Sequence, residues 1–373
     1  MMRDCIQKKL DLIHQLYPSA RIAASKRRWE SVWDKDKRAD RRPFVYYPPL
    51  FDAYNALHTA KERLLTSLDE IIIRGQVGDD FIPSIFCGCR QSTIPNMFGA
   101  KEVVRGGDAT CDKILFSPKD IDRLECGKIT DGTVAKMWLD MQSYIIDETE
   151  GEIPVHVVDM QGPFDVAGQM FGYDNLFVCA YEEPSRYDKL MSLISDAFIC
   201  FWKAQQKTCG ELFIGTHLFA WDYVPQNTGA SMSIDSLVMV SPEFYQGYYR
   251  KYIEKMADEF GGLVIHSCGD FRHVVPDLMR TKGLKAMNAS QLSLRQLVEA
   301  GMTADTVGIL TLPLEGLEDL ADVIRHTNMR VDPTFIGNWP VFGADVPPVE
   351  EWTSEQKYRL KEIDDRIVRT LGS

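Results

Sequence analysis

A histidine and a cysteine two residues apart, His266 and Cys268, follow a short apolar run in the stretch GGLVIHSCGD (261–270). Residues 263–265 predict a buried strand, and the two side chains leave its C-terminal end on the same side while the backbone stays extended. Such a pair can build a soft-metal site or a reactive group. The alternative is a purely structural role, because buried cysteine often serves as a small apolar side chain.

The elements around this stretch alternate between short apolar runs and longer amphipathic ones. The two clearest helices are 187–207 and 242–260, the second with Ser241 as N-cap and Pro242 in its first turn. Strand–helix repetition predicts a parallel sheet buried on both faces, and about eight units favour a single (β/α)8 TIM-type barrel, in the α/β class, over an open sheet. The predicted strands are 82–86, 155–160, 212–216, 263–265, 284–287, 307–310 and 334–336.

The chain divides in sequence pattern near residue 76. Residues 1–76 read as an N-terminal helical extension, with helices at 22–33 and 53–73, and residues 77–373 as the barrel. The stretch FVYYPPLFDAY (44–54) contains more aromatic side chains than a simple helical cap on the barrel needs. It either covers the barrel mouth or forms a contact in a homodimer.

Composition excludes several classes of function. With 42 basic and 54 acidic side chains, the net charge of −12 disfavours nucleic acid and anionic membrane surfaces as partners. No apolar run approaches the ~20 residues of a membrane span, and the N-terminus lacks the apolar block of a signal peptide. Nine scattered cysteines indicate a reducing compartment, so we expect a cytoplasmic protein. Neither GxGxxG nor GxxxxGK occurs, which leaves nucleotide binding without support.

Chemistry in a barrel belongs at the C-terminal ends of the strands. The predicted ends carry polar groups in CGCR (87–90), DMQGPFD (159–165), THLFAWD (216–222), HSCGD (266–270), NASQ (288–291) and GNW (337–339). The candidate substrate-binding residues from these ends are Arg90, Gln161, His217, Trp221 and Asn288. For each of them, packing at the barrel rim or a tight turn is the competing interpretation.

Several segments together, in this order, resemble the uroporphyrinogen decarboxylase superfamily, which includes the decarboxylase of the haem pathway and zinc-dependent methyltransferases that work with corrinoid proteins. They are MFGAKEVV (97–104), KILFSPKDIDRL (113–124), the Gly-Pro-Phe motif in QGPFDVAGQMFGYDNLF (161–177), MSIDSLVMVSPEFYQGYYRKYIEKM (232–256) and HSCGD (266–270).

The resemblance does not extend to the decarboxylase's own motif. True porphyrinogen decarboxylases carry Arg-Gln-Ala-Gly-Arg and a following catalytic aspartate. Here CRQSTIPNMFGA keeps Arg90 and Gln91 but lacks the second arginine and the aspartate. A substrate with many carboxylates needs cations, and its protonation needs an acid, so the sequence disfavours that reaction.

The resemblance to the methyltransferase branch implies zinc, held by a His-x-Cys pair and a more distant cysteine, and a methylcorrinoid carried by a partner protein. His266 and Cys268 match the pair, but no cysteine follows Cys268. Cys87, Cys89 or a carboxylate such as Asp235 are the candidates for the third ligand, and Asp235 and His266 are the expected catalytic residues. Zinc matches such donors and lowers the pKa of a bound thiol.

Two alternatives stay open. One is a metal-free decarboxylase or lyase acting on a small carboxylated substrate, with Arg90 pairing the carboxylate and His266 as general acid. The other is a non-catalytic protein that binds a corrinoid or another tetrapyrrole.

Overall fold

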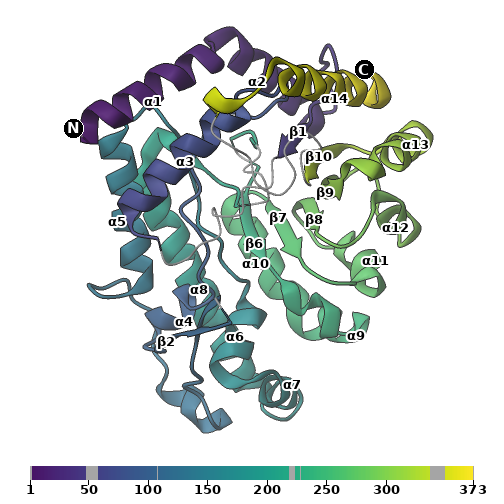
Figure 1. Cartoon of the computed structure of the whole chain (residues 1–373). Helices are drawn as coiled ribbons and strands as arrows, with labels where there is room; N and C mark the ends of the chain where they lie inside the picture. Colours follow the sequence, from purple (N-terminus) through teal and green to yellow (C-terminus); the bar gives the residue numbers. More distant parts are fainter. Residues whose placement is uncertain are drawn as a thin grey trace.

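A computed structural model of the chain describes residues 2–47, 58–106, 108–217, 223–226, 228–336 and 349–372. Helices and strands alternate along most of it (Figure 1). The strands are β1 (Val45–Tyr47), β2 (Glu102–Arg105), β3 (Asp108–Cys111), β4 (Val155–His156), β5 (Phe213–Ile214), β6 (Ala230–Ser233), β7 (Leu263–Ser267), β8 (Leu284–Ala289), β9 (Val307–Pro313) and β10 (Val331–Ile336). The longer helices are α1 (Met2–Leu16), α2 (Ser19–Trp33), α3 (Ala60–Arg74), α5 (Val134–Glu148), α6 (Pro163–Phe171), α7 (Tyr173–Glu182), α8 (Pro184–Cys209), α10 (Arg250–Phe260), α13 (Leu317–Thr327) and α14 (Ser354–Leu371). Shorter ones are α4 (Thr93–Met97), α9 (Pro242–Phe244), α11 (Val275–Leu278) and α12 (Leu294–Glu299).

Six strands form one parallel sheet in the order β1-β10-β9-β8-β7-β6. Figure 1 shows β6 to β10 side by side, with α10 to α13 outside them. At the β6 edge, a parallel bridge pairs Ser233 with Gln161, and further bridges pair Asp159 with Cys89 and Val155 with Ile85. The segments 82–89 and 155–161 thus continue the curved sheet. The fold is α/β and consistent with a TIM-type barrel, although the strand pairs of the described residues do not close a complete circle.

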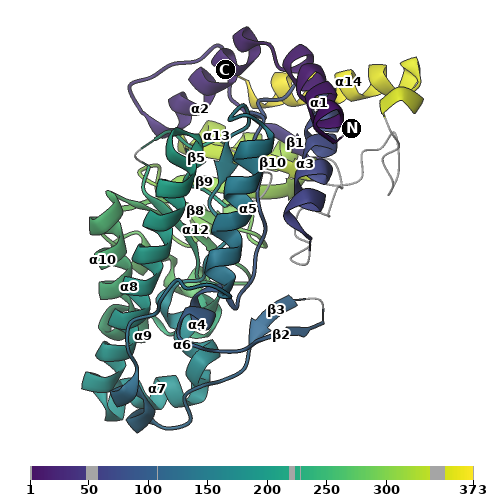
Figure 2. The same cartoon turned by 90° about the vertical axis from the view of Figure 1, so that its left-hand side faces the viewer.

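Most predicted strands are present, and the differences have physical reasons. The segment predicted at 82–86 makes only isolated bridges, and β5 is two residues long. Strand β6 was not predicted because its sequence, ASMS, has no apolar run, although all four residues are buried. Strand β1 lies within the segment predicted as a helical extension and pairs with β10. The hairpin β2–β3 was also missed, and it projects from the body in Figure 2.

The predicted helix 242–260 is interrupted. Ser241 caps it as expected, since its side chain accepts a hydrogen bond from the Phe244 amide. A π-helical segment (Tyr245–Tyr249) then separates α9 from α10. It buries Tyr249, whose hydroxyl reaches Asp165 beside the candidate site.

Glycine permits a close approach where β6 ends. A Cβ added to Gly162 would lie 2.5 Å from the Ile234 side chain, and the Gly162 amide donates to the Ser233 carbonyl at 2.7 Å. Helix α6, which begins at Pro163, therefore starts directly against the end of β6. This contact fixes the turn that carries Asp235.

Candidate metal centre

Three side chains of different chemical type converge where β6 and β7 end: Asp235, His266 and Cys268. One ligand atom from each lies within 4.8 Å of the others. His266 Nε2 is 3.3 Å from Cys268 Sγ and 3.7 Å from Asp235 Oδ1. Asp235 Oδ1 also accepts a hydrogen bond from the Cys268 amide at 2.7 Å, which ties the two strand ends together. We call these three residues the triad.

A hydrogen bond from Nδ1 to Asn288 fixes the orientation of the His266 ring. Its Nδ1 lies 2.5 Å from Asn288 Oδ1, and the Asn288 amide nitrogen donates to the Ile309 carbonyl at 3.0 Å. Because the amide nitrogen is committed to that carbonyl, Oδ1 is the acceptor and Nδ1 carries the hydrogen. The Nε2 atom therefore faces Cys268 and Asp235. Metal-ligating histidines are commonly oriented by such a partner on the other ring nitrogen.

Electrostatics favour positive charge at this imidazole. Burial lowers the pKa of His266, but the hydrogen bonds to Cys268 and Asn288 and the carboxylates of Asp235 and Asp159 outweigh it and raise the pKa to about 9. The surroundings therefore stabilise a cation on the Nε2 side, whether that cation is a proton or a metal ion. The two would compete for the same lone pair.

The donor set fits zinc. Tetrahedral coordination with ordinary Zn–S, Zn–N and Zn–O bonds separates the ligand atoms by about 3.4–3.6 Å. The separations of 3.3 Å and 3.7 Å from His266 Nε2 to the other two ligand atoms fall close to that range. A thiolate, an imidazole and a carboxylate are all common zinc ligands, and three protein ligands leave one position for a substrate.

Asp235 is held in place by the residue after it. The amide and the hydroxyl of Ser236 both donate to the buried Asp165 carboxylate, at 2.8 Å and 2.7 Å. Burial raises the pKa of Asp165 to about 7, with the nearby Asp235 adding to the effect against the hydrogen bonds from Ser236. Asp165 lies in the first turn of α6, so the Gly-Pro-Phe segment supports the triad from a neighbouring helix.

A second polar cluster lies beside the triad and centres on Asp159. Its Oδ1 accepts from Ser233 Oγ at 2.7 Å and lies 3.2 Å from His217 Nε2. The His217 ring also contacts Ser231 Oγ at 2.7 Å, and its centroid is 6.5 Å from that of His266. Although burial raises the pKa of Asp159, His217 and Ser233 lower it below its ordinary value. Sequence analysis quoted this stretch without singling out Asp159, and its place at a strand end was the available signal.

Of the other predicted site residues, some lie around the triad and others do not. Asn288 orients His266, and His217 belongs to the Asp159 cluster, so both lie around the triad. Gln161 is bonded to Gln169 of α6. Arg90 forms an ion pair with Glu102 of β2, 2.7 Å from Nη1 to Oε1. Trp221 lies outside the described residues.

The two upstream cysteines do not join the triad in the described structure. Cys87 is buried, and burial raises the pKa of its thiol, with Cys209 nearby. Cys89 lies next to Asp159, and burial together with that carboxylate raises the pKa of its thiol well above the ordinary value. Of the three candidates for the third ligand, only Asp235 approaches His266 and Cys268.

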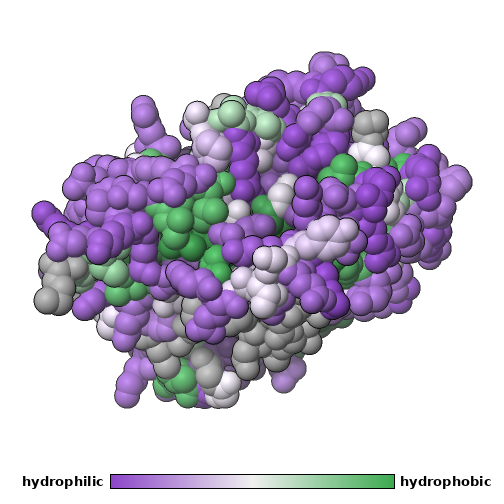
Figure 3. All heavy atoms as spheres, turned by 45° about the horizontal axis from the view of Figure 1, so that its top comes forward, coloured by the Kyte–Doolittle hydropathy of each residue, from purple (hydrophilic) through white to green (hydrophobic). Residues whose placement is uncertain are grey.

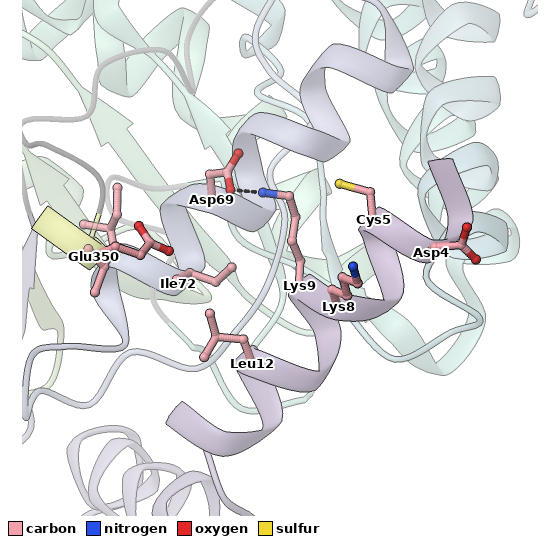
Figure 4. Close-up of a pocket in the computed structure, with 10 residues that line it drawn as sticks. Asp4, Cys5, Lys8, Lys9, Leu12, Asp69, Ile72 and Glu350 are labelled. Carbon is pink, nitrogen blue, oxygen red and sulfur yellow. Dashed lines mark hydrogen bonds and ion pairs between the residues drawn. The ribbon is translucent and has the colours of Figure 1, made fainter. Parts of the chain in front are cut away.

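A surface groove lies elsewhere, between α1 and α3 (Figure 4). It has a volume of about 780 Å³, and an ion pair between Lys9 and Asp69 crosses it. Its other lining side chains include Leu12, Ile72 and Glu350. None of the predicted site residues that the structure describes lines this groove, whereas the triad combines polar donor atoms with a position at the strand ends.

The surface in the orientation of Figure 3 is mostly hydrophilic, with separate hydrophobic areas. Among the described residues, no helix is long and apolar enough to span a bilayer.

Comparisons with known proteins agree with the resemblance seen in sequence. The family model described as "Uroporphyrinogen decarboxylase (URO-D)" matches residues 86–221. Among solved structures, a methyltransferase from Methanosarcina mazei superposes with a TM-score of 0.61 at 12% sequence identity, covering 92% of this chain and 98% of that one. No curated protein sequence matches the chain. At such low identity the structural likeness shows a shared fold, and the family model matches a uroporphyrinogen decarboxylase domain over residues 86–221, in agreement with the resemblance seen in sequence.

Proposed function

We propose that the protein is a zinc-dependent methyltransferase that moves a methyl group between a corrinoid carried by a partner protein and a thiol acceptor. The observation that carries the proposal is the convergence of Asp235, His266 and Cys268 within 4.8 Å at the strand ends. Zinc bound there would lower the pKa of an incoming thiol, so that its sulfur attacks a methyl group at neutral pH. The similarity to a methyltransferase fold supports this branch of the superfamily.

The chain's own residues supply binding and orientation. His266 and Cys268 present one nitrogen and one sulfur, and Asp235 presents one oxygen. Asn288 keeps the His266 ring in the tautomer that leaves Nε2 available, and Asp165 holds the turn that carries Asp235. Strand β7, which carries His266, is buried throughout. The cytoplasmic location and the corrinoid partner belong to this proposal.

The structure offers less for the metal-free decarboxylase. That reaction needs a cation to pair the substrate carboxylate. Arg90, the expected cation, is ion-paired with Glu102, whose other oxygen accepts from Ser92 at 2.5 Å. No specific observation favours that alternative.

The test has two parts. Purified protein dialysed against a chelator and then titrated with zinc should bind about one ion per chain, and His266→Ala and Cys268→Ser should each lose it. Cys126→Ser is the matched control, because Cys126 is an exposed cysteine away from the triad. The zinc-loaded protein should then transfer methyl groups from methylcobalamin to a small thiol. Equal zinc binding by the wild type and both triad variants would refute the proposal, and zinc or corrinoid binding without any turnover would leave only a binding protein.

A further inference from the structure

We propose that the acceptor thiol of this site carries a compact, uncharged apolar group, such as a phenyl ring, and that a pocket beside the triad binds this group. The inference rests on the proposed function, since it names the class of acceptor. The pocket lies at the ends of β8 and β9, where α12 and α13 lie outside them (Figure 1), and no triad residue lines it.

The pocket is small and lined mainly by leucine side chains. It has a volume of about 220 Å³. An apolar cavity of roughly 150 Å³ can hold a benzene ring, so a phenyl ring or a branched alkyl group of similar size fits here. The apolar walls come from β9, α12 and α13 and include Leu294, Leu310, Leu312 and Leu320.

The pocket offers no partner to a charged group. Among the described residues that line it, Asp319 is the only ionisable one. Its carboxylate already pairs with Arg295, at 2.6 Å from Oδ1 to Nη2. A charged group that enters the pocket loses its hydration without an ion pair in return. The pocket therefore selects an uncharged group.

Two hydroxyl groups on the pocket wall lack hydrogen-bond partners. The oxygen atoms Ser290 Oγ and Thr311 Oγ1 are buried, and neither makes a hydrogen bond in the part of the chain that the structure describes. Both residues line the pocket. Because nearly all buried polar groups in proteins are paired, two such hydroxyls indicate a partner from outside the chain. One polar atom in the linker between the sulfur and the apolar group can supply it.

The pocket is joined directly to the turn that carries Cys268. The amide of Gly269, the residue after Cys268, donates to Oε1 of Gln291, which lines the pocket. The Ser290 amide donates to the Ser267 carbonyl at 3.4 Å. The wall of the pocket and the metal-binding turn are thus neighbours at the same end of the sheet.

The strand register sets the length of the linker. His266 pairs with Asn288, and Asn288 pairs with Ile309 of β9, two residues before Thr311. Strands β7 and β9 are therefore two strand spacings apart, roughly 10 Å between backbones. A short chain of carbons can place the sulfur on the metal and the apolar group in the pocket.

The experiment measures thiol affinity on cobalt-substituted protein. Cobalt(II) in place of zinc gives a sulfur-to-metal charge-transfer band when a thiolate binds, so affinity is measured without turnover. The probes are propane-1-thiol, 2-phenylethanethiol, 3-phenylpropane-1-thiol and 4-(2-mercaptoethyl)benzoate. We expect the better of the two phenyl thiols to bind at least about tenfold more tightly than propane-1-thiol, because the ring leaves water. The carboxylate on the same ring should abolish that gain.

Leu312→Trp fills the pocket and separates it from other apolar surfaces. Leu312 is partly buried and lines the pocket, whereas Leu314 is partly buried and does not, so Leu314→Trp is the matched control. The ratio of affinities for the phenyl and propyl thiols should fall about tenfold in Leu312→Trp and stay unchanged in Leu314→Trp. Metal content and the thermal transition show whether each variant is folded.

The outcomes separate this inference from the proposed function. Equal affinities of the wild type for propyl and phenyl thiols would overturn the inference alone, and so would a carboxylated ring that binds as tightly as the plain ring. An unchanged ratio in folded Leu312→Trp would do the same. If that variant does not fold, the two wild-type comparisons decide. Absence of a charge-transfer band with every thiol would overturn the proposed function as well.

Discussion

Two regions of this molecule hold carboxylates in different surroundings, one fully buried and one partly exposed. In the N-terminal region, the side chain of Asp80 is fully buried and accepts from Ser25 Oγ (3.1 Å), Arg28 Nη1 (2.8 Å), Arg41 Nη1 (2.5 Å) and the Phe44 amide (3.2 Å). At the strand ends, Asp235 receives one backbone amide and lies 3.7 Å from one imidazole nitrogen. The Asp80 carboxylate has its acceptor positions filled by these donors. The Asp235 carboxylate keeps acceptor positions that face His266 and Cys268.

The number of partners distinguishes a carboxylate that holds the fold together, such as Asp80, from one that can bind a further ligand, such as Asp235. A buried carboxylate whose lone pairs are all used contributes to one fixed arrangement of α2, β1 and the segment before residue 82. A partly exposed carboxylate that keeps acceptor capacity beside an imidazole and a thiol can accept a further partner, such as a cation. The predictions below probe this contrast.

The largest effect on folding is expected at Asp80. Replacing it with alanine leaves Arg28 and Arg41 without their buried partner, and breaking a buried pair in this way typically costs about 3–5 kcal/mol. Denaturant titration of Asp80→Ala should show a loss of that size. His266→Ala, measured without metal, should change the free energy of unfolding by much less. Equal losses of unfolding free energy in Asp80→Ala and His266→Ala would contradict the idea that the first carboxylate stabilises the fold and the triad does not.

The second prediction concerns the support of the triad. Asn288→Ala removes the acceptor for His266 Nδ1, and loss of such a partner typically weakens metal affinity about 10–100-fold. Competition with a chromophoric chelator measures the change. Asn175→Ala is the matched control, because the Asn175 side chain donates to the Phe171 carbonyl at 3.1 Å and not to a triad residue, so the affinity should be unchanged. Full affinity in Asn288→Ala would show that the histidine is oriented by other contacts.

The smallest effect is a pH dependence of stability where α14 packs against the N-terminal region at Gly78. Burial raises the pKa of Asp364 to about 7, against the hydrogen bond from the Gly78 amide. An unfolded aspartate has a pKa near ~3.9, so between about pH 4 and 7 the folded state holds a proton that the unfolded state releases. The free energy of unfolding should therefore fall as pH rises through this window. Asp364→Asn should flatten part of that slope, by on the order of 1–2 kcal/mol.

Asp79 contributes to the same slope and limits how much one substitution can remove. Burial raises its pKa to about 6 despite Arg21 and Arg74. Stability curves at pH 5 and pH 8 for the wild type and for Asp364→Asn measure the slope. An identical slope in both proteins would mean that Asp364 does not titrate in this range.

The sequence predicted the three residues of the triad as candidates, but it did not single out the carboxylates around them. The apolar run 263–265 predicted a strand, and β7 extends from it through His266 to Ser267, so the pair His266 and Cys268 could be placed at its end. Asp235 was recognisable because it lies in a segment that resembles the superfamily. Asp165 and Asp159 were not singled out, because their partners Ser236 and Ser233 are 71 and 74 residues away and no local pattern marks those contacts.

The same limit explains the strands. Parallel strands buried on both faces, such as β7 and β9, are recognisable in the sequence as apolar runs. Strand β6 carries ASMS, and its burial depends entirely on its neighbours in the sheet. Arg90 was predicted to meet substrate from its position at a strand end, but its pairing with Glu102 depends on the hairpin β2–β3, which the sequence did not reveal.

The most direct test of the central claim is X-ray absorption at the zinc edge of the zinc-loaded protein. The triad predicts a coordination sphere with one sulfur from the protein at about 2.3 Å and nitrogen or oxygen ligands at about 2.0–2.2 Å, and the sulfur contribution should vanish in Cys268→Ser. A sphere without sulfur, or one with two protein sulfurs that survives the loss of Cys268, would contradict the account.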